Sequence, residues 1–260
     1  MLIQVFMNQT EWSDRHLLKE QLRTEIWALL KDQKVTRRDP VGHIPNFVGA
    51  EQATAQLATL PIWQQAKVIK CNPDAPQQSV RLRALQEGKR LYMAVPRLTN
   101  KHCFVELTAA LLQPKGIPLE TAATMRNALI HGQLVSFAEM TPIDLVVVGC
   151  VAATRAGGRT GKGAGFADLE LAMLQMFGLI DRHTPIVTTI HSLQLVDHSR
   201  LPMQPHDWAL DWVVTPAEVM QTNSTHPRPQ GLDWDAIQPD QYQKIPILRQ
   251  LRQQAFDELS

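Results

Sequence analysis

Hydrophobic residues recur along this chain in two patterns, which together predict alternating strands and helices. The run at 144–152 is apolar and rich in β-branched residues, which is typical of a strand buried on both faces. Four shorter apolar runs predict further strands at 67–71, 91–95, 185–190 and 212–215. The first two flank a helical pattern at 77–87, so they predict a βαβ unit with parallel strands and a right-handed crossover.

Apolar residues at helical spacing predict the helices. They cover 13–31, 51–60, 77–87, 121–131 and 169–176, and Gly178 ends the last of them. The stretch 104–112 fits either a strand or a helix, and Pro216 indicates the start of a short helix. We therefore expect an α/β fold with a mostly parallel sheet between helices.

The composition is typical of a globular protein with a large core. The chain has 260 residues, of which 44% are hydrophobic, and a formal net charge of +1. We expect one α/β domain at 1–220 and a polar, proline-rich extension at 221–260 that packs on it. The balanced charge gives no support for a nucleic-acid partner. No apolar run reaches the roughly 20 residues that a membrane span needs.

The three cysteines favour a reducing compartment. Cys71, Cys103 and Cys150 are widely spaced and odd in number, so we interpret them as small buried hydrophobic residues. The N-terminus does not have the basic–apolar–small pattern of a secretion signal. We therefore expect a cytoplasmic protein, as a monomer or a homodimer, with no membrane partner.

The strongest indication of chemistry is the glycine-rich stretch 157–168, between the strand at 144–152 and the helix at 169–176. Its glycines permit positive φ angles and a close approach of the backbone to a ligand. Arg159 and Lys162 add positive charge, and the amides at the start of the helix attract anions. The stretch therefore predicts a phosphate-binding loop. The alternative is a flexible surface turn.

Two common nucleotide-binding motifs do not fit this stretch. A P-loop requires four residues between its first glycine and its Gly-Lys pair, but three separate Gly157 from Gly161. It also requires Ser or Thr after the lysine, where Gly163 stands. The dinucleotide motif fails because Gly165 comes one residue too early. The predicted phosphate site is thus of another type.

A pair of cations marks the helix at 13–31. Leu22 and Ile26 belong to its apolar stripe, whereas Lys19 and Arg23 are four residues apart on the other side. Like charges at this spacing repel each other when no anion is present. The pair is either a solvated face or part of an anion site.

Further polar residues follow the predicted strands at their carboxyl ends, where open α/β sheets bind their ligands. This rule brings Arg97, His191 and Thr215 to the same edge as the glycine-rich stretch. Asp168 and Asp207 could hold Mg²⁺ there, together with phosphate oxygens and waters. Alternatively, Asp168 is an acid favoured by the helix dipole and Asp207 caps a turn.

Three motifs in chain order resemble the 5-formyltetrahydrofolate cyclo-ligase family, also called methenyltetrahydrofolate synthetases. GRTGKGAGFAD at 158–168 is similar to the family signature G-x-R-x-G-x-G-x-G-Y-Y-D without its first spacer. KEQLR at 19–23 matches the K-x-x-L-R of the family's first helix. Gln194, PHD at 205–207 and DWVVT at 211–215 are similar to the family's last conserved positions. The resemblance covers most of the chain.

The resemblance implies a Rossmann-like three-layer α/β/α fold of the NagB/RpiA/CoA-transferase type. It also implies conversion of 5-formyltetrahydrofolate to 5,10-methenyltetrahydrofolate with ATP and Mg²⁺. By the family pattern, Arg159 and Lys162 would be catalytic, and Asp168 and Asp207 would hold Mg²⁺. ATP would be bound by Lys19, Arg23, Gly158, Gly161, Gly163, Gly165 and Phe166. Such residues suit phosphoryl transfer, which depends on positioning and charge neutralisation.

Two departures from the family pattern concern the folate side of the site. Phe166-Ala167 stands where the family has paired tyrosines, and the glutamate that holds the folate has no counterpart. Asp74 is the nearest acid. These departures resemble the divergent branch of methenyltetrahydrofolate synthetase domain-containing proteins. The alternatives to a cyclo-ligase are a non-catalytic binder of a nucleotide or folate, and a kinase or ligase for another small acid.

Overall fold

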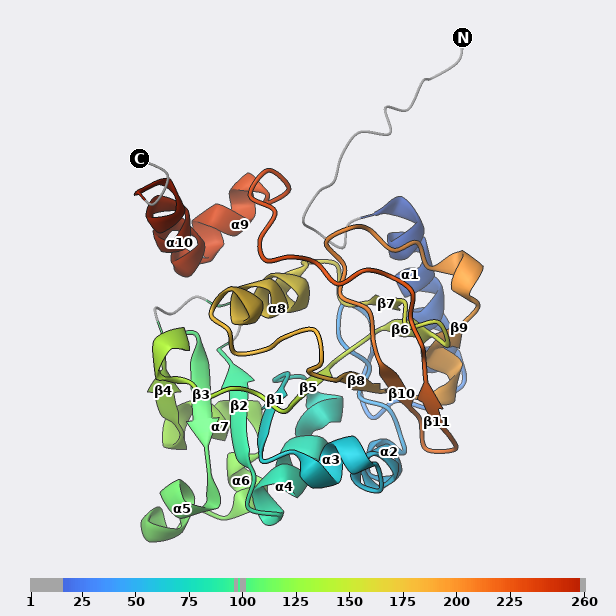
Figure 1. The fold of residues 1–260 in the computed structure, drawn as a ribbon. Helices are drawn as coiled ribbons and strands as arrows, with labels where there is room; N and C mark the ends of the chain where they lie inside the picture. Colours follow the sequence, from blue (N-terminus) through green and yellow to red (C-terminus); the bar gives the residue numbers. More distant parts are fainter. Residues whose placement is uncertain (1–15, 96–97, 99–101, 258–260) are drawn as a thin grey trace.

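The centre of the fold is a large, mostly parallel sheet (Figure 1). The computed structural model describes residues 16–95, 98 and 102–257. Within them, one sheet has the order β11-β10-β8-β5-β1-β2-β3-β4. Its strands are β1 (Val68–Cys71), β2 (Arg90–Ala94), β3 (Phe104–Leu107), β4 (Gln133–Val135), β5 (Leu145–Val148), β8 (Ile186–Thr189), β10 (Trp212–Val214) and β11 (Val219–Gln221). The five from β10 to β2 are parallel, and β11, β3 and β4 add antiparallel edges.

Helices cover both faces of this sheet, as the parallel strands require, because both faces of such a sheet are apolar. The helices are α1 (Leu17–Asp32), α2 (Ala50–Ala58), α3 (Pro61–Gln65), α4 (Gln78–Gln86), α5 (Ala109–Leu112), α6 (Leu119–Ala122), α7 (Met125–His131), α8 (Phe166–Met176), α9 (Pro239–Lys244) and α10 (Pro246–Asp257). Figure 1 shows α2, α3, α4, α6 and α7 on one face and α8 on the other. The expected βαβ unit is confirmed as β1, α4 and β2.

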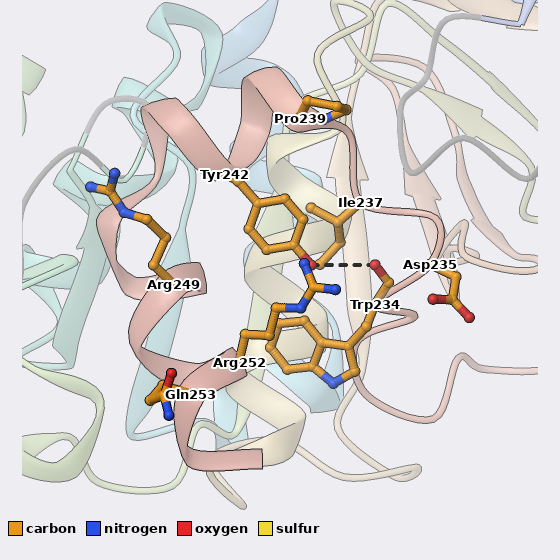
Figure 2. A pocket seen from close by; sticks show the side chains of 8 residues that line it. All are labelled: Trp234, Asp235, Ile237, Pro239, Tyr242, Arg249, Arg252 and Gln253. Carbon is orange, nitrogen blue, oxygen red and sulfur yellow. Dashed lines mark hydrogen bonds between the residues drawn. The ribbon is translucent and has the colours of Figure 1, made fainter. Parts of the chain in front are cut away.

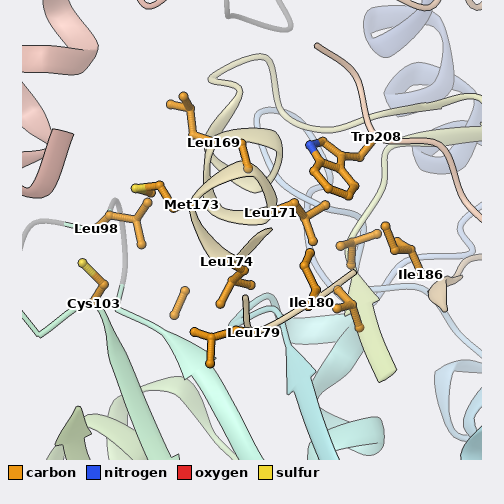
Figure 3. Packing of buried hydrophobic residues seen from close by; sticks show 14 of the residues in the cluster. Leu98, Cys103, Leu169, Leu171, Met173, Leu174, Leu179, Ile180, Ile186 and Trp208 are labelled. Carbon is orange, nitrogen blue, oxygen red and sulfur yellow. The ribbon is translucent and has the colours of Figure 1, made fainter. Parts of the chain in front are cut away.

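Side chains alternate between two cores along the central strands, as the two-residue period of a strand dictates. In β5, Leu145 and Val147 face the α4 side, whereas Val146 and Val148 face α8. Figure 3 shows the α8-side core, in which Leu169, Leu171, Met173, Leu174 and Trp208 lie together. Packing in this core therefore fixes the position of α8 against the sheet. Because the glycine-rich stretch leads directly into α8, its position is fixed as well.

The apolar run at 144–152 does not form one strand, so this expectation was wrong. β5 ends at Val148, and the chain then enters a second sheet of order β7-β6-β9. The Gln194 side chain donates to the carbonyls of Cys150 and Val151 at 2.9 and 3.1 Å, which satisfies buried backbone groups at this bend. The second sheet consists of β6 (Ala152–Thr154), β7 (Arg159–Thr160) and β9 (Leu195–Val196). A β6–β7 hairpin thus stands between β5 and α8.

Helix α1 packs beside this small sheet (Figure 1). The pattern predicted a helix at 13–31. Positions 13–15 lie outside the described residues, and the helix begins at Leu17 with His16 as its N-cap. Leu22, Ile26 and Leu30 are buried in a cluster that includes Ala152 of β6 and the preceding Val151. The small sheet and α1 therefore carry their own apolar core.

The structure shows which elements form at 104–112 and after Pro216. The stretch 104–112 contains both β3 and α5, so each of the two interpretations applies to one half. No helix starts at Pro216 in the described chain. The Thr215 hydroxyl instead accepts from the amides of Ala217 and Glu218, at 3.2 and 3.0 Å, in a turn that leads into β11.

The C-terminal extension packs against the open side of α8 (Figure 1). Its apolar side chains join the α8-side core: Leu232, Ala236, Ile237, Ile245, Ile247, Leu248 and Leu251. The Gly231 amide donates to Gln175 Oε1 of α8 at 2.6 Å. The extension contributes α9 and α10, and the expected boundary after residue 220 falls within β11.

This architecture confirms the expected α/β class with a mostly parallel central sheet. The strand order departs from chain order at β5, which lies between β8 and β1. Among the described helices, none has the length and the apolar character needed to cross a bilayer.

Candidate active site

A cavity of about 420 Å³ opens beyond the carboxyl ends of β1, β2 and β5. This is where an open α/β sheet is expected to bind a ligand. Its wall contains polar residues from several segments: Asn72 and Asp74 after β1, Arg159, Gly161, Lys162 and Gly165 of the glycine-rich stretch, and Asp168 and Glu170 of α8. Apolar groups of Ile44, Val95, Leu98, Met125 and Phe166 complete it. The cavity therefore combines cations, carboxylates and an apolar wall.

The glycines between β7 and α8 adopt conformations that other residues rarely take. Gly163 and Gly165 have φ angles of +103° and +67°, in the left-handed region. A Cβ added at Gly163 would lie 3.1 Å from Nη2 of Arg23, so the loop lies directly against this guanidinium. Gly165 is the N-cap of α8, whose first residue, Phe166, lines the cavity. The loop thus brings the positive end of a helix and a cation to one place.

A contact between Arg159 and Asp168 joins β7 to the first turn of α8. Their side chains are buried and form an ion pair. Arg159 Nε also donates to the Trp208 carbonyl at 2.7 Å, and the Trp208 amide donates to Asp168 Oδ1 at 2.9 Å. Both charged groups are held by a charge-assisted and a backbone hydrogen bond. Arg159 lies on a strand, β7, and not in a loop as the sequence suggested.

Lys19 and Arg23 are buried, so of the two alternatives for this pair the solvated face was wrong. Lys19 Nζ donates to Asp207 Oδ2 at 2.6 Å. Arg23 Nη1 donates to the Thr160 hydroxyl at 2.9 Å. The repulsion expected between the two cations is offset by these partners. Arg23 connects α1 to the glycine-rich stretch, and Lys19 connects α1 to the segment around Asp207.

Lys162 occupies the mouth of the cavity. Its Nζ donates to Asp74 Oδ1 at 3.0 Å, and its side chain is 43% exposed. Asp74 follows β1, so this contact joins the glycine-rich stretch to the loop between β1 and α4. Lys19, Arg23 and Arg159 are buried, whereas the partly exposed Lys162 side chain has room to move toward a ligand.

The cavity wall contains a buried ion pair that the sequence pattern did not indicate. Lys70, in the middle of β1, pairs with Glu170 on α8, and the two side chains are 0% and 5% exposed. Lys70 also donates to Asn72 Oδ1 at 2.5 Å. Burial raises the pKa of Glu170, and the Lys70 ammonium opposes that shift. The only signal in the sequence was a lysine inside the apolar strand 67–71.

Several expected site residues lie apart from the cavity. Among the described residues, Lys19, Arg23, Gly158, Gly163 and Asp207 are not part of its wall. His191 and Thr215 are not either: His191 caps a short turn, and its Nδ1 accepts from the Leu193 amide at 3.2 Å. Arg97 lies outside the described residues. The edge of the sheet therefore divides, and only the β1, β2 and β5 part forms the cavity.

The fit of Mg²⁺ rests on Asp168. This carboxylate lines the cavity, whereas Asp207 lies behind it and is paired with Lys19. In the described residues, no three His, Cys, Asp or Glu side chains converge to hold a metal. Mg²⁺ in nucleotide sites commonly takes one or two carboxylates and fills its other positions with phosphate oxygens and water. A single carboxylate beside the glycine-rich loop fits such a shared site.

A second hollow, of about 640 Å³, lies in the extension (Figure 2). The Arg252 guanidinium is 5.1 Å from the centre of the Tyr242 ring, and the Tyr242 hydroxyl donates to the Trp234 carbonyl at 3.3 Å. It contains none of the signature residues. It is therefore separate from the cavity that the glycine-rich stretch lines.

The sequence is similar to those of known proteins over most of its length. Residues 15–216 match the model of the 5-formyltetrahydrofolate cyclo-ligase family. The methenyltetrahydrofolate synthase domain-containing protein of Bos taurus is 37% identical over 238 residues, which cover 91% of this chain and 62% of that protein. The protein of the same name from Homo sapiens is 36% identical over 236 residues, with coverages of 90% and 61%. The chain thus spans somewhat less than two thirds of these relatives.

A solved structure supports the same assignment at the level of the fold. The NMR structure of 5,10-methenyltetrahydrofolate synthetase from Aquifex aeolicus has a TM-score of 0.51 and 19% identity, and the match covers 81% of this chain and 96% of that chain. The similarity to domain-containing relatives confirms the divergent branch that the motifs indicated. Because the family model matches more than half of its length, the chain belongs to the 5-formyltetrahydrofolate cyclo-ligase family.

Proposed function

We propose that this chain converts 5-formyltetrahydrofolate to 5,10-methenyltetrahydrofolate with ATP and Mg²⁺. In this reaction the formyl oxygen attacks the γ-phosphorus of ATP and releases ADP. N10 of the folate then attacks the activated carbon, and phosphate leaves with the former formyl oxygen. The observation that carries the proposal is the convergence of Lys162, Asp168 and the Gly161–Gly165 loop at one cavity. These groups supply the positioning and charge neutralisation that phosphoryl transfer requires.

The phosphates of ATP would lie against the glycine-rich loop at the start of α8. The loop amides and the helix dipole would bind phosphate oxygens, and Arg23 behind Gly163 adds positive charge. Lys162 would exchange Asp74 for the transferred phosphate, because it is the partly exposed cation at the mouth. Asp168 would hold Mg²⁺, while Arg159 fixes the direction of its carboxylate. Lys19 and Asp207 would support this layer from behind.

The folate would occupy the remainder of the cavity. Val95, Leu98 and Met125 supply an apolar wall for a flat ring, and Asn72 and Asp74 supply polar groups after β1. Phe166 keeps an aromatic ring at the family's first tyrosine position, but Ala167 leaves the second position without one. The folate side is thus altered more than the phosphate side.

A second candidate function is a binder that holds a nucleotide or folate without turnover. The replacement of the paired tyrosines by Phe166-Ala167 favours it. It predicts a calorimetric signal for ATP or 5-formyltetrahydrofolate with no product. The cyclo-ligase predicts the same binding together with product.

The deciding experiment follows the absorbance of 5,10-methenyltetrahydrofolate. We expect it to rise only when the protein, 5-formyltetrahydrofolate, ATP and Mg²⁺ are all present. Lys162→Ala should lower kcat/KM about 10- to 100-fold, because it removes a charge-assisted hydrogen bond to the phosphate. Lys115→Ala, at an exposed lysine that donates to the His131 carbonyl, is the matched control and should leave the rate unchanged. No rise with ATP binding intact would reject the cyclo-ligase.

A further inference from the structure

The Lys70–Glu170 pair is the least expected feature of the α8-side core. Lys70 lies in β1, an interior strand of the parallel region, and its register partners on β2 and β5 are Tyr92 and Val146. Both partners belong to the apolar cluster on this face. Glu170 is in the first half of α8, between residues that pack into the same cluster. Two opposite charges therefore occupy positions where the pattern of the fold requires apolar side chains.

Stability gives no reason for such a pair. Removing two charges from water costs as much as their attraction returns, and well-packed apolar residues are commonly as stable or more so. Charged pairs that are this deeply buried often belong to functional sites. Here the pair reaches a cavity, because Glu170 and Asn72 both line its wall. Its place in the wall points to a ligand.

Lys70 orients two cavity groups at once. It pairs with the Glu170 carboxylate and donates to Asn72 Oδ1. Because the Asn72 oxygen is taken by Lys70, the amide NH₂ is left as the donor of this side chain. In the described chain, Lys70 is the one group that pairs with the Glu170 carboxylate, so the carboxylate keeps capacity to accept further hydrogen bonds. The wall thus presents an acceptor and a donor side by side.

We propose that Glu170 and Asn72, positioned by Lys70, form a specificity element that recognises the aminopyrimidinone edge of a pterin ring. The carboxylate would accept from the amino and ring N–H groups, and the Asn72 amide would donate to a ring carbonyl or nitrogen. This inference rests on the proposed function for the folate end of the substrate. It assigns ring recognition to Asn72, which follows β1, and to Glu170 of α8, in a chain that has no counterpart of the family's glutamate.

Asp74 is the other carboxylate of the cavity that could recognise the ring, and its surroundings differ from those of Glu170. It is paired with Lys162, which is 43% exposed, at the mouth of the cavity. Glu170 is held by a fully buried lysine, so its direction is fixed by the sheet. A fixed carboxylate discriminates between donors better than one whose partner is free to leave, because binding requires less ordering.

The test compares binding of pterin with that of 2-desaminopterin, which has the same ring without the amino group. Fluorescence titration of the full chain should show about tenfold tighter binding of pterin, since the analogue leaves the carboxylate without a donor. Glu170→Gln should bring the ratio to about 1. Calorimetry should find that its affinity for ATP stays unchanged. Glu218→Gln, at an exposed glutamate that pairs with Arg155, is the matched control and should keep the tenfold ratio.

A second variant covers the case in which Glu170→Gln does not fold with Lys70 left unpaired. Lys70→Met/Glu170→Leu removes both charges and should fold, and its pterin preference should also be lost. A wild-type chain without preference for pterin, or a folded variant that keeps it, would overturn the inference. If the wild-type chain turns over 5-formyltetrahydrofolate but Glu170→Gln keeps the preference for pterin, this inference alone is overturned. If Glu170→Gln loses the preference but the wild-type chain shows no turnover, the cyclo-ligase is rejected and this inference stands.

Discussion

At the scale of single residues, the cations of the family motifs carry two tasks. Lys19 and Arg159 are buried and paired with Asp207 and Asp168, so each helps to hold the fold as well as to place positive charge near the loop. Lys162 is partly exposed and pairs with Asp74 at the mouth of the cavity. Variants of the buried cations will therefore change stability, whereas replacing Lys162 tests its proposed contact with the phosphate.

Replacing Lys19 alone should destabilise the protein strongly. Lys19→Met leaves the buried Asp207 carboxylate without its cation, which costs about 3–5 kcal/mol. Urea unfolding followed by circular dichroism measures the loss. Lys31→Ala breaks an exposed pair with Asp39, which solvent screens, and should leave the stability nearly unchanged. Lys19→Met/Asp207→Leu should regain most of the stability, and a double variant as unstable as the single one would show that the pair is not the cause.

The cysteines should be inert in the folded protein. All three are buried, and burial raises the pKa of Cys71 to about 11 and that of Cys103 to about 12. The thiolate is the reactive form, so a thiol reagent at pH 8 should label the native chain negligibly and label three thiols after unfolding. Labelling of the native chain should rise only as the pH approaches 11. Rapid labelling at pH 8 with the fold intact would contradict the burial.

At the scale of elements, periodicity predicted those that bury a regular pattern. β1, α4, β2, β8, β10 and α8 have the expected type because each presents apolar residues at the period of its structure. The β6–β7 hairpin was not predictable, because 144–152 reads as one apolar run. The bend after Val148 depends on the Gln194 side chain, 40 or more residues away in the sequence.

The candidate site was also predictable only in part, because some of its contacts join residues that are far apart in the sequence. Arg159, Gly161, Lys162, Gly165 and Asp168 lie in one local motif and do line the cavity. The burial of Lys19 follows from Asp207, which is 188 residues away, and that of Lys70 follows from Glu170. A local pattern cannot show a partner that only the tertiary fold supplies.

The extension should support the glycine-rich loop through Gln241. This buried side chain of α9 donates to the Ala164 carbonyl at 3.3 Å. Gln241→Ala should weaken ATP binding about 3- to 10-fold, since one hydrogen bond that orders the loop is lost, and should cost about 1 kcal/mol of stability. Calorimetry measures the first effect and urea unfolding the second. Gln230→Ala, at an exposed glutamine of the same extension, should change neither. Unchanged ATP affinity in Gln241→Ala would separate the extension from the site.

At the scale of the whole molecule, the cavity joins distant parts of the chain. Ile44, Asp74, Val95 and Lys162 line one cavity although they follow four different elements. α1 supports the glycine-rich loop from beneath through Arg23, and the extension supports it through Gln241. A ligand in this cavity contacts several segments at once, so its binding should stabilise the molecule as a unit.

Mg²⁺ and ATP together should therefore raise the melting temperature more than ATP alone. A ligand at 100 times its Kd adds about 2.7 kcal/mol, which corresponds to roughly 5–10 °C for a chain of this size. Thermal unfolding by differential scanning fluorimetry measures the two increments. Asp168→Asn keeps the size of the side chain but loses its charge, so it should keep an increment with ATP and lose the one that Mg²⁺ adds. Asp32→Asn, at an exposed carboxylate of α1, should behave as the wild type. Equal increments with and without Mg²⁺ in the wild-type chain would show that Asp168 serves the fold through Arg159 and does not hold the metal.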